Sequence, residues 1–350
     1  MLRGKRKQAR VFFIPFVGGP CAGKSKGLTY VARKLRELGY ICIIIPESPT
    51  MIFGAGLDPM DFQDPESRYL IQCAIFATQL GHEEQFLPLA EYLSILYGKT
   101  VILLSDRALF DGLGYIDFSK FVSILKQSNI SRLERLYKYH GVVDLVSAAD
   151  GAEDSYSNKS NKCRSEDAPL ARRFDVGTLE GYLGHPNMTI VHNIENEQTI
   201  SFRKKKMRML EAVLAMIPDS NSSAMPMRYE LLEFSKYMLE NTGHPFVVQE
   251  VTRTTTRKGT VFEKITSRND YKPETIYRRG IQVVSKSEYQ KYINQKNSTV
   301  EENIRYSFVH DKRYLNVDVN KKQSILEFKK FHGTKNPFII PDFLGKAIRV

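Results

Sequence analysis

The sequence predicts an α/β sandwich built on a parallel sheet, followed by an antiparallel β domain. Short, mainly apolar runs alternate with helical patterns through residues 10–218, as in parallel sheets covered by helices on both faces. Shorter β-branched and aromatic runs with partial alternation occupy residues 227–350, which is typical of antiparallel strands. The length of 350 residues is also about right for two domains.

The elements of the first half follow from apolar periodicity and from residues that end helices. Leu28, Val31, Leu35 and Leu38 recur at helical spacing, and Pro218 stops the last helix. The expected strands are 11–17, 40–45, 101–104, 142–146 and 188–192. The expected helices are 24–38, 67–96 with interruptions near Gly81 and Pro88, 119–126, 132–138, 168–183 and 199–216.

The boundary between the two halves is marked by a short polar stretch. Residues 219–226 are expected to be a linker between a nucleotide-binding domain at 10–218 and a β domain at 227–350. A second polar stretch, 151–167, is expected to be a surface loop or lid. The strands expected in the β domain are 228–232, 246–252, 260–266, 275–284, 305–308, 314–319 and 324–328.

Composition excludes several classes of protein. Hydrophobic residues make up 42% of the chain and charged residues 26%, which excludes wholesale disorder and fibrous repeats. Strongly apolar runs, such as 41–46 and 101–104, are far shorter than the roughly 20 residues of a membrane span. Four cysteines at irregular spacing indicate free thiols in a reducing compartment. We therefore expect a cytoplasmic protein without a transmembrane segment.

The net charge points to anionic partners. It is +12 for the whole chain, and residues 219–350 carry 23 Lys and Arg against 15 Asp and Glu, a net +8. Such a surplus favours phosphates, an acidic membrane surface or nucleic acid. The chain has no recognisable DNA-binding motif. Peripheral contact with a membrane stays open, although the basic run 203–208 spans too few helical turns to face one way.

Residues 18–25 match the phosphate-binding pattern G-x-x-x-x-G-K-[ST] without a mismatch. The run leaves an apolar strand and opens a helix, so its backbone N–H groups can close around phosphate oxygens. Lys24 is expected to reach the β- and γ-phosphates and Ser25 to ligate Mg²⁺. A chance glycine turn is the alternative. The residues expected to bind nucleotide are Gly18, Gly19, Pro20, Cys21, Ala22, Gly23, Lys24, Ser25 and Lys26.

Four apolar residues ending near Asp106 have the Walker B form. An Asp at the carboxyl end of a parallel strand can hold Mg²⁺ beside a phosphate loop. The alternative is an Asp that caps the following helix. Together with the loop, Asp106 predicts a P-loop NTPase or kinase-like fold.

Further charged residues are candidates for catalysis. Glu47 follows the second strand and could accept a proton from a hydroxyl nucleophile, or it could cap the next helix. Arg107 could reach a phosphate of the acceptor, and Asp111 offers a second carboxylate. Arg164, with Arg172 and Arg173, lies on or beside the polar loop, where arginines could neutralise a transferring phosphoryl group. A solvated helix face is the alternative for these three.

The motifs as a set resemble those of the TRPL-translocation-defect protein family of eukaryotes. That family joins a NadR-type AAA P-loop domain to a CYTH-like triphosphate-tunnel domain. The N-terminal likeness covers nearly all of residues 10–218, and the C-terminal likeness is looser. The matching segments are GGPCAGKS at 18–25, IPES at 45–48, LSDRALFDG at 104–112, LVSAADGAEDSYS at 145–157, NKCR at 161–164, GHP at 184–186 and VHNI at 191–194.

The resemblance implies a kinase-like fold joined to a β tunnel or barrel. Members of the family are described as binding GTP and acidic phospholipids and as acting in membrane trafficking. By position, Gly18, Gly23, Lys24, Ser25 and Asp106 would hold nucleotide and Mg²⁺. Glu47 and Arg107 also resemble the acid and the arginine of related nucleoside kinases, in which the Glu serves as base.

The acidic strand of tunnel triphosphatases is degenerate here, since only Glu230 and Glu250 stand near the expected positions. Basic residues remain, and alternation along strands lets several share one face. A basic bore poor in acids suits anion binding better than metal-assisted hydrolysis. Solvated strand faces are the alternative. The residues expected to bind the anion are Lys264, Arg268, Arg278, Arg279, Arg305 and Arg313.

Three hypotheses of function follow. The first is a regulatory switch that binds Mg²⁺ with GTP or ATP and whose β domain holds an acidic phospholipid or another phosphorylated anion. The second is a small-molecule or nucleoside-type kinase with Glu47 as base. The third is a triphosphate hydrolase in the β tunnel. The missing N-K-x-D motif gives no support to a Ras-type guanine site.

Overall fold

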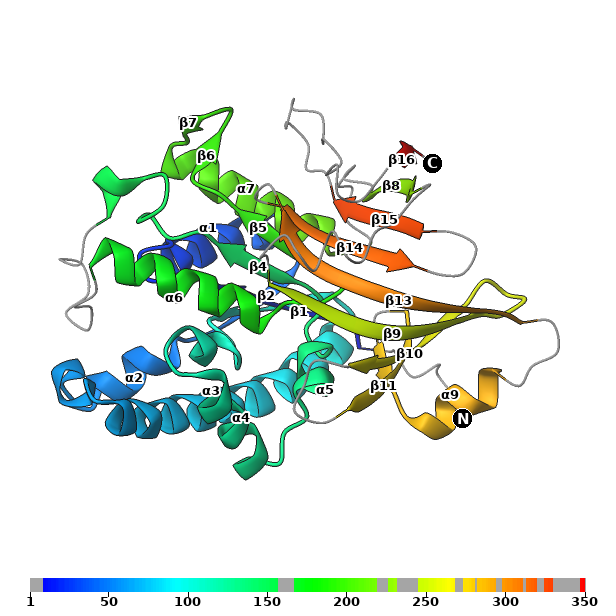
Figure 1. Cartoon of the computed structure of the whole chain (residues 1–350), viewed down its shortest axis with the longest axis horizontal. Coiled ribbons are helices and arrows are strands. Elements are labelled where there is room, and N and C mark those ends of the chain that lie inside the picture. The colour runs from blue at the N-terminus through cyan, green and yellow to red at the C-terminus, as the bar shows by residue number, and fades with distance from the viewer. Residues whose placement is uncertain are drawn as a thin grey trace. The chain divides into compact units, whose positions relative to one another are not determined.

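The structure is a computed structural model (Figure 1). It describes residues 9–156, 167–218, 226–231, 245–267, 273–280, 282–293, 298–310, 313–319, 324–329 and 347–349. By the pattern of contacts the chain forms two compact units. The first unit comprises Met1–Ser128, Tyr139–Gly181 and Ile190–Asn221, and the second comprises Asn129–Lys138, Tyr182–Thr189 and Ser222–Val350. The second unit thus includes two short segments from within residues 10–218.

The first unit is built on a five-stranded sheet with the order β2-β3-β1-β4-β5. β1 pairs in parallel with β3 and β4, and β2 pairs in parallel with β3. Nearly every side chain of β1 and every one of β3 is buried, as expected for strands covered on both faces. The strands are β1 (Val11–Val17), β2 (Ile41–Ile45), β3 (Val101–Asp106), β4 (Val142–Leu145) and β5 (Met188–Val191).

Helices cover both faces of this sheet (Figure 1). α1 packs on α7, while α3 packs on α4, and α1 and α3 both contact β1 and β3. The helices of this unit are α1 (Lys24–Glu37), α2 (Ser48–Gly54), α3 (Pro65–Tyr97), α4 (Phe118–Gln127), α6 (Ala168–Gly181) and α7 (Phe202–Ala215). Smaller elements are the 3₁₀ turns η1 (Pro59–Phe62), η2 (Asp111–Gly114) and η3 (Glu153–Ser155), with the β6 (Ile194–Glu195) and β7 (Gln198–Thr199) hairpin.

The described part of the second unit contains an antiparallel sheet with the order β12-β11-β10-β9-β13-β14-β15-β8-β16 and the helices α5 (Arg132–Leu136) and α9 (Lys286–Ile293). Its inner strands alternate buried and exposed residues, as β11 does. The strands are β8 (Pro226–Leu231), β9 (Phe246–Thr255), β10 (Val261–Ser267), β11 (Glu274–Arg279), β12 (Gln282–Val284), β13 (Thr299–His310), β14 (Arg313–Val319), β15 (Ser324–Lys329) and β16 (Ala347–Arg349).

The predicted fold class is confirmed at the level of a parallel α/β core and a separate antiparallel sheet. Closure of the second sheet into a tunnel or barrel stays a prediction. Three details of the prediction were wrong. α3 runs unbroken past Gly81 and Pro88, the expected strand 275–284 is two strands that turn at Gly280, and the expected strand 305–308 is the centre of the longer β13.

Two further predictions concern the polar segments and the absence of a membrane span. Most of the linker 219–226 and residues 157–166 of the polar loop lie outside the described residues. No helix among the residues described is long and apolar enough to cross a membrane.

Candidate functional site

The phosphate loop depends on glycine at both of its ends. Gly18 has φ +123°, and a Cβ there would lie 2.2 Å from the carbonyl oxygen of Leu145. Gly23, the residue before α1, has φ +88°, and a Cβ there would lie 2.6 Å from the ring of Phe202. A side chain would be strained at either position, because both φ values favour glycine. Neighbouring β4 and α7 thus leave no room for any other residue.

Lys24 lies inside the loop. Its Nζ donates hydrogen bonds to the carbonyl oxygens of Gly18 at 2.6 Å and Gly19 at 2.8 Å. Burial, followed by the charge of Arg107, lowers the pKa of Lys24 to about 8. An ammonium that is bound only to loop carbonyls and has lost most of its water is well placed to contact a phosphate enclosed by the same loop.

Ser25 and Asp106 meet where α1 begins and β3 ends. The Ser25 Oγ donates to Asp106 Oδ2 at 2.5 Å, because β3 lies directly beside the strand that leads into the loop. Asp106 is 5% exposed, and its Oδ1 has no hydrogen-bond partner in the described residues. Burial raises the pKa of Asp106. Mg²⁺ prefers oxygen ligands. The Ser25 hydroxyl and the Asp106 carboxylate, whose Oδ1 is buried without a partner, therefore suit Mg²⁺.

Glu47 and Arg107 form a buried ion pair beside the loop. Arg107 Nε donates to Glu47 Oε1 at 2.6 Å, its Nη1 donates to Asp111 Oδ2 at 3.3 Å, and the Thr50 hydroxyl donates to Glu47 Oε2 at 2.7 Å. Burial alone would raise the pKa of Glu47, but Arg107 and then Lys24 outweigh it and lower the pKa to about 2. The backbone of Arg107 has φ +76°, a strained conformation of the kind found at functional sites.

A cavity of about 170 Å³ opens beside this pair. Pro20, Glu47, Arg107 and Asp111 lie in its wall. We call it the aromatic cavity, because six of its lining residues are Phe53, Phe62, Phe76, Tyr115, Phe121 and Phe174. Sequence reasoning missed it. In the sequence these residues look like ordinary core residues. They come from α2, η1, α3, α4, α6 and the position after η2, and only the fold brings them together.

The loop is also supported from behind by charged residues that the sequence did not single out. Asp175 of α6 accepts from the Gly19 amide at 2.5 Å and from the Ser147 amide at 3.0 Å. Lys205 of α7 donates to the carbonyl oxygens of Ala22 at 3.0 Å and Val146 at 2.7 Å. Burial raises the pKa of Asp175 and lowers that of Lys205 to about 8. These contacts fix the loop rather than leaving it mobile.

Other predicted residues of the first unit lie elsewhere. Arg164 is outside the described residues. Arg172 donates to the Ala149 carbonyl and pairs with Glu153 at 3.3 Å, and with Arg173 it lines a groove next to the aromatic cavity. Lys26 is exposed on α1.

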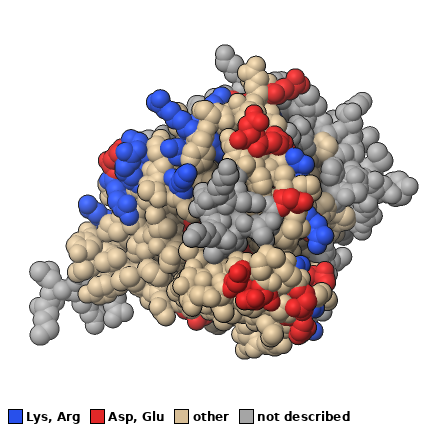
Figure 2. Space-filling model, turned by 90° about the vertical axis from the view of Figure 1, so that its left-hand side faces the viewer, with Lys and Arg blue, Asp and Glu red and all other residues tan. Residues whose placement is uncertain are grey.

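The basic run 203–208 does not present one face. Arg203 and Lys204 are exposed, but Lys205 is buried among carbonyls and Arg208 pairs with Glu195. Figure 2 shows Lys and Arg side chains gathered on one part of the face that it presents.

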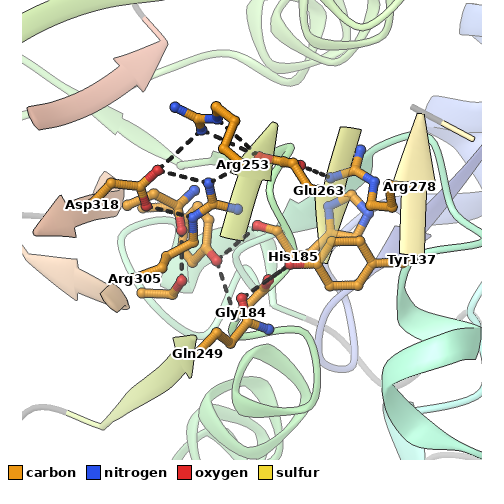
Figure 3. Close-up of polar contacts among 12 residues, drawn as sticks. Tyr137, Gly184, His185, Gln249, Arg253, Glu263, Arg278, Arg305 and Asp318 are labelled. Atoms are coloured by element: carbon orange, nitrogen blue, oxygen red, sulfur yellow. Dashed lines mark hydrogen bonds and ion pairs between the residues drawn. The ribbon is translucent and has the colours of Figure 1, made fainter. Parts of the chain in front are cut away.

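The second unit holds a cluster of three arginines and two carboxylates, which we call the arginine cluster (Figure 3). Arg278, Arg305 and Glu263 are buried, whereas Arg253 and Asp318 are half-buried. Arg253 and Arg278 stand directly opposite Glu263, across β9, β10 and β11. Arg305 stands opposite Asp318 across β13 and β14. The N–O distances are 3.2 Å for Arg253–Glu263, 3.1 Å for Arg278–Glu263, 3.2 Å for Arg253–Asp318 and 2.7 Å for Arg305–Asp318.

The cluster has one more positive than negative group. Burial opposes ionisation of both carboxylates, but the guanidinium of Arg305, acting before the others, lowers the pKa of Glu263 and of Asp318. Arg278 Nε and Arg305 Nη1 are buried and have no hydrogen-bond partner in the described residues. Among the described residues no group of three or more His, Cys, Asp or Glu is placed to hold a metal ion.

The structure brings together two of the predicted anion-binding residues, Arg278 and Arg305. Lys264 is exposed next to the buried Glu263, and Arg279 pairs with Glu288 at 3.0 Å, because neighbouring residues on a strand face opposite ways. Arg313 lies at the start of β14, and Arg268 is outside the described residues. Arg253 and the two carboxylates complete the cluster, and they are not among the residues expected to bind the anion.

No protein-family model and no curated protein matches the sequence. Among solved structures, thymidylate kinase from Ehrlichia chaffeensis is similar with a TM-score of 0.37 and 13% sequence identity, over 58% of this chain and 99% of that chain. Membership of the TRPL-translocation-defect family and a CYTH-like second domain therefore stay predictions.

Proposed function

We propose that the first unit is a Mg²⁺-dependent phosphotransferase. A nucleoside triphosphate would bind at residues 18–25, and its γ-phosphoryl group would pass to a hydroxyl of a small molecule in the aromatic cavity. The observation that carries this proposal is the lining of the cavity, which includes Pro20 of the phosphate loop together with Glu47 and Arg107. Loop, carboxylate and guanidinium border one cavity, as phosphoryl transfer to a bound alcohol requires.

The loop residues have separate roles in this proposal. Lys24 would exchange the carbonyls of Gly18 and Gly19 for the β- and γ-phosphate oxygens. Ser25 and Asp106 would hold Mg²⁺, and the bound Mg²⁺ would neutralise part of the charge on the phosphates. Asp175 and Lys205 keep the loop in shape, so little ordering is needed when nucleotide binds.

Glu47 would accept the proton of the attacking hydroxyl. The hydroxyl oxygen bonds to the γ-phosphorus as the bond from that phosphorus to the β–γ bridging oxygen breaks, and the nucleoside diphosphate leaves. With a pKa of about 2, Glu47 is a weak base while it is paired with Arg107. We infer that Arg107 must turn to the negative charge of the substrates first, which would raise the pKa of Glu47 toward a useful value.

The test is an assay of transfer from Mg²⁺–ATP or Mg²⁺–GTP to a panel of small alcohols, including sugars, polyols and nucleosides. The Glu47→Gln variant should bind nucleotide as the unchanged protein does and lose transfer to every alcohol. Hydrolysis without transfer to any alcohol would refute the proposal. Tight binding with slow hydrolysis would instead favour the regulatory switch. The same assay decides whether the phosphoryl donor is GTP or ATP.

A second function is favoured by the arginine cluster. We propose that its surplus positive charge, with the unpaired Arg278 Nε and Arg305 Nη1, binds a phosphorylated anion, for which an acidic phospholipid headgroup is one source. Sedimentation with phosphatidylinositol-phosphate vesicles tests the lipid source, and titration with free tripolyphosphate tests the soluble one. Arg278→Gln should weaken whichever binds. A role in membrane trafficking and triphosphate hydrolysis in the β tunnel both stay predictions.

A further inference from the structure

A groove lies next to the aromatic cavity, near the residues where α3 begins. Its volume is about 630 Å³, whereas the cavity has about 170 Å³. Arg68 and Tyr115 line both spaces, so the two spaces meet at these side chains. The phosphotransferase proposed above makes no use of the groove. We call it the side groove, and its charged lining residues are Arg68, Asp117, Lys120, Arg172, Arg173 and Glu180.

Part of the wall of the side groove is a close contact between two pieces of backbone. A Cβ on Gly114 would lie 2.6 Å from the carbonyl oxygen of Phe174, and a Cβ on Gly177 would lie 2.8 Å from the Cα of Gly114. Both glycines line the groove. Beside them the ring centroids of Tyr115 and Phe174 lie 4.5 Å apart. This wall is therefore set by the packing of η2 on α6, and the groove is formed before any ligand binds.

Arg68 lies where the cavity and the groove meet, and it has no counter-ion there. The residue is half-buried. Within the described part of the chain, its guanidinium group donates one hydrogen bond, to the carbonyl oxygen of Gln63 at 2.9 Å, and pairs with no carboxylate. Charged side chains that have lost water are normally paired. A guanidinium group carries five N–H donors in a planar fork, so most of the donors of Arg68 remain for a ligand.

The other cations of the side groove differ in how far the chain already uses them. Lys120 Nζ donates to the carbonyl oxygen of Pro65 at 2.7 Å, and Arg172 pairs with Glu153 at 3.3 Å. Arg173 of α6 is exposed, and it makes no hydrogen bond or ion pair with another described residue. Arg173 is therefore available to a ligand in the same way as Arg68.

The two carboxylates of the side groove do not neutralise these two arginines. Burial raises the pKa of Glu180, whereas a guanidinium group close by would lower it. Asp117 precedes α4 and forms no ion pair with a described residue. Among the described residues that line the groove, Arg68 and Arg173 are thus the cations left for a ligand.

A guanidinium group matches an oxyanion, to which it can donate two parallel hydrogen bonds. A ligand that reaches Arg68 can also enter the aromatic cavity, since Arg68 lines both spaces. We propose that the acceptor alcohol carries an oxyanion, either a phosphate ester or a carboxylate, which binds Arg68 and Arg173 in the side groove while the hydroxyl lies at Glu47. This inference rests on the proposed phosphotransferase function, whose acceptor it describes.

The position of Arg68 along α3 sets the length of this acceptor. Gln79 Nε2 lies 3.5 Å from the carbonyl oxygen of Arg107, so Gln79 marks the end of the cavity where transfer takes place. Arg68 precedes Gln79 by eleven residues, which at a rise of 1.5 Å per residue is about 16 Å along the helix. A short hydroxy acid does not span this separation. The acceptor is therefore an elongated molecule with its hydroxyl and its oxyanion at opposite ends.

The experiment is calorimetric titration of the full chain with straight-chain alcohols of increasing length. One series ends in a phosphate, a second ends in a carboxylate, and neutral alkanols of equal length are the reference. The phosphate loop is first filled with Mg²⁺ and ADP or GDP, so that the phosphate series does not bind there. Long members of at least one anionic series should bind about ten- to a hundredfold more tightly than the neutral alkanols, as expected for hydrogen bonds to a charged group. The series that binds identifies the oxyanion.

Substitutions show whether this preference comes from the side groove. Arg68→Gln should remove the preference for the anionic alcohols, whereas Arg68→Lys keeps the charge and should keep part of it. Arg173→Gln should weaken the same ligands about two- to fivefold, because Arg173 is exposed. Arg257→Gln lowers the net charge equally at an exposed position of the second unit and should change nothing. Anion binding at the arginine cluster is the same in the unchanged chain and Arg68→Gln, so the difference between them reports the side groove alone.

A thermal melt of each variant separates binding from folding. Arg68→Gln should melt at about the same temperature as the unchanged chain, because one hydrogen bond to a backbone carbonyl is all that it loses within the described residues. A lower melting temperature with an unchanged preference for anionic alcohols would overturn the inference. Equal affinity of the unchanged chain for anionic and neutral alcohols at every length would also overturn it.

The two proposals can fail separately. Binding of a long anionic alcohol that depends on Arg68, without phosphoryl transfer to any alcohol, would refute the phosphotransferase and support the anion site. Transfer to neutral alcohols that is as efficient as transfer to anionic ones, and that Arg68→Gln leaves unchanged, would support the phosphotransferase and refute the anion site.

Discussion

The Glu47–Arg107 pair makes the stability of the protein depend on pH in a way that can be calculated. Arg107 and Lys24 lower the pKa of Glu47 from 4.5 to about 2, and the two paired side chains are 15% and 10% exposed. Since the pKa is lower in the folded state, the pair stabilises the fold fully above the unfolded value of 4.5. That stabilisation is lost as the pH falls through about 2. At about 1.4 kcal/mol per pH unit the full contribution is about 3 kcal/mol.

The Glu47→Gln variant isolates this contribution. Between pH 6 and pH 3 the difference in unfolding free energy between the unchanged protein and Glu47→Gln should shrink by about 2 kcal/mol. The assay is urea unfolding followed by far-ultraviolet circular dichroism, because the chain contains no tryptophan. Glu91→Gln, at an exposed position of α3, is the matched control and should give the same difference at both pH values. A constant difference for Glu47→Gln would refute the pairing.

Three other predictions address the loop and the arginine cluster. Lys24→Ala should lower the affinity for nucleotide about a hundredfold or more, since a charge-assisted contact to phosphate is lost, and unchanged affinity in calorimetry would contradict the loop assignment. Asp106→Asn should weaken nucleotide binding when Mg²⁺ is present but should not change nucleotide binding when excess chelator removes the metal. An equal loss of affinity under both conditions would argue against a metal role. Glu263→Gln should destabilise the second unit by about 3–5 kcal/mol because it leaves the buried guanidinium groups of Arg278 and Arg305 and the half-buried one of Arg253 with one carboxylate. Urea unfolding measures this, and a loss below about 1 kcal/mol would mean the cluster is well hydrated.

Local sequence signals predicted the framework of the first unit well. The apolar runs gave β1 through β5 within a few residues, because a strand buried on both faces must be apolar throughout. The phosphate loop pattern and Asp106 are also local, and β3 lies where it brings Asp106 to Ser25. Pro88 misled the prediction of α3, because a single proline can be tolerated within a helix that is held by tertiary packing.

The aromatic cavity could not be predicted from the sequence in the same way. Gln72 and Gln79 of α3 both line this cavity and look alike in the sequence, yet of the two only Gln79 is hydrogen-bonded within the described residues, to Ser48, Glu83 and Ser105. The arginine cluster has the same limit. Arg278 and Arg279 are neighbours in the sequence, yet strand register gives one to Glu263 and the other to Glu288. Which residue faces inward depends on pairings between strands that are distant in sequence.

The most direct test of the central claim follows the γ-phosphoryl group itself. Phosphorus NMR or a γ-labelled nucleotide would be used with Mg²⁺ and the alcohol panel, comparing the unchanged protein with Glu47→Gln at matched nucleotide occupancy. The account predicts a phosphorylated alcohol for the unchanged protein and a rate about 10²- to 10⁴-fold lower for the variant. Equal rates of transfer, or inorganic phosphate as the sole product of both proteins, would contradict it.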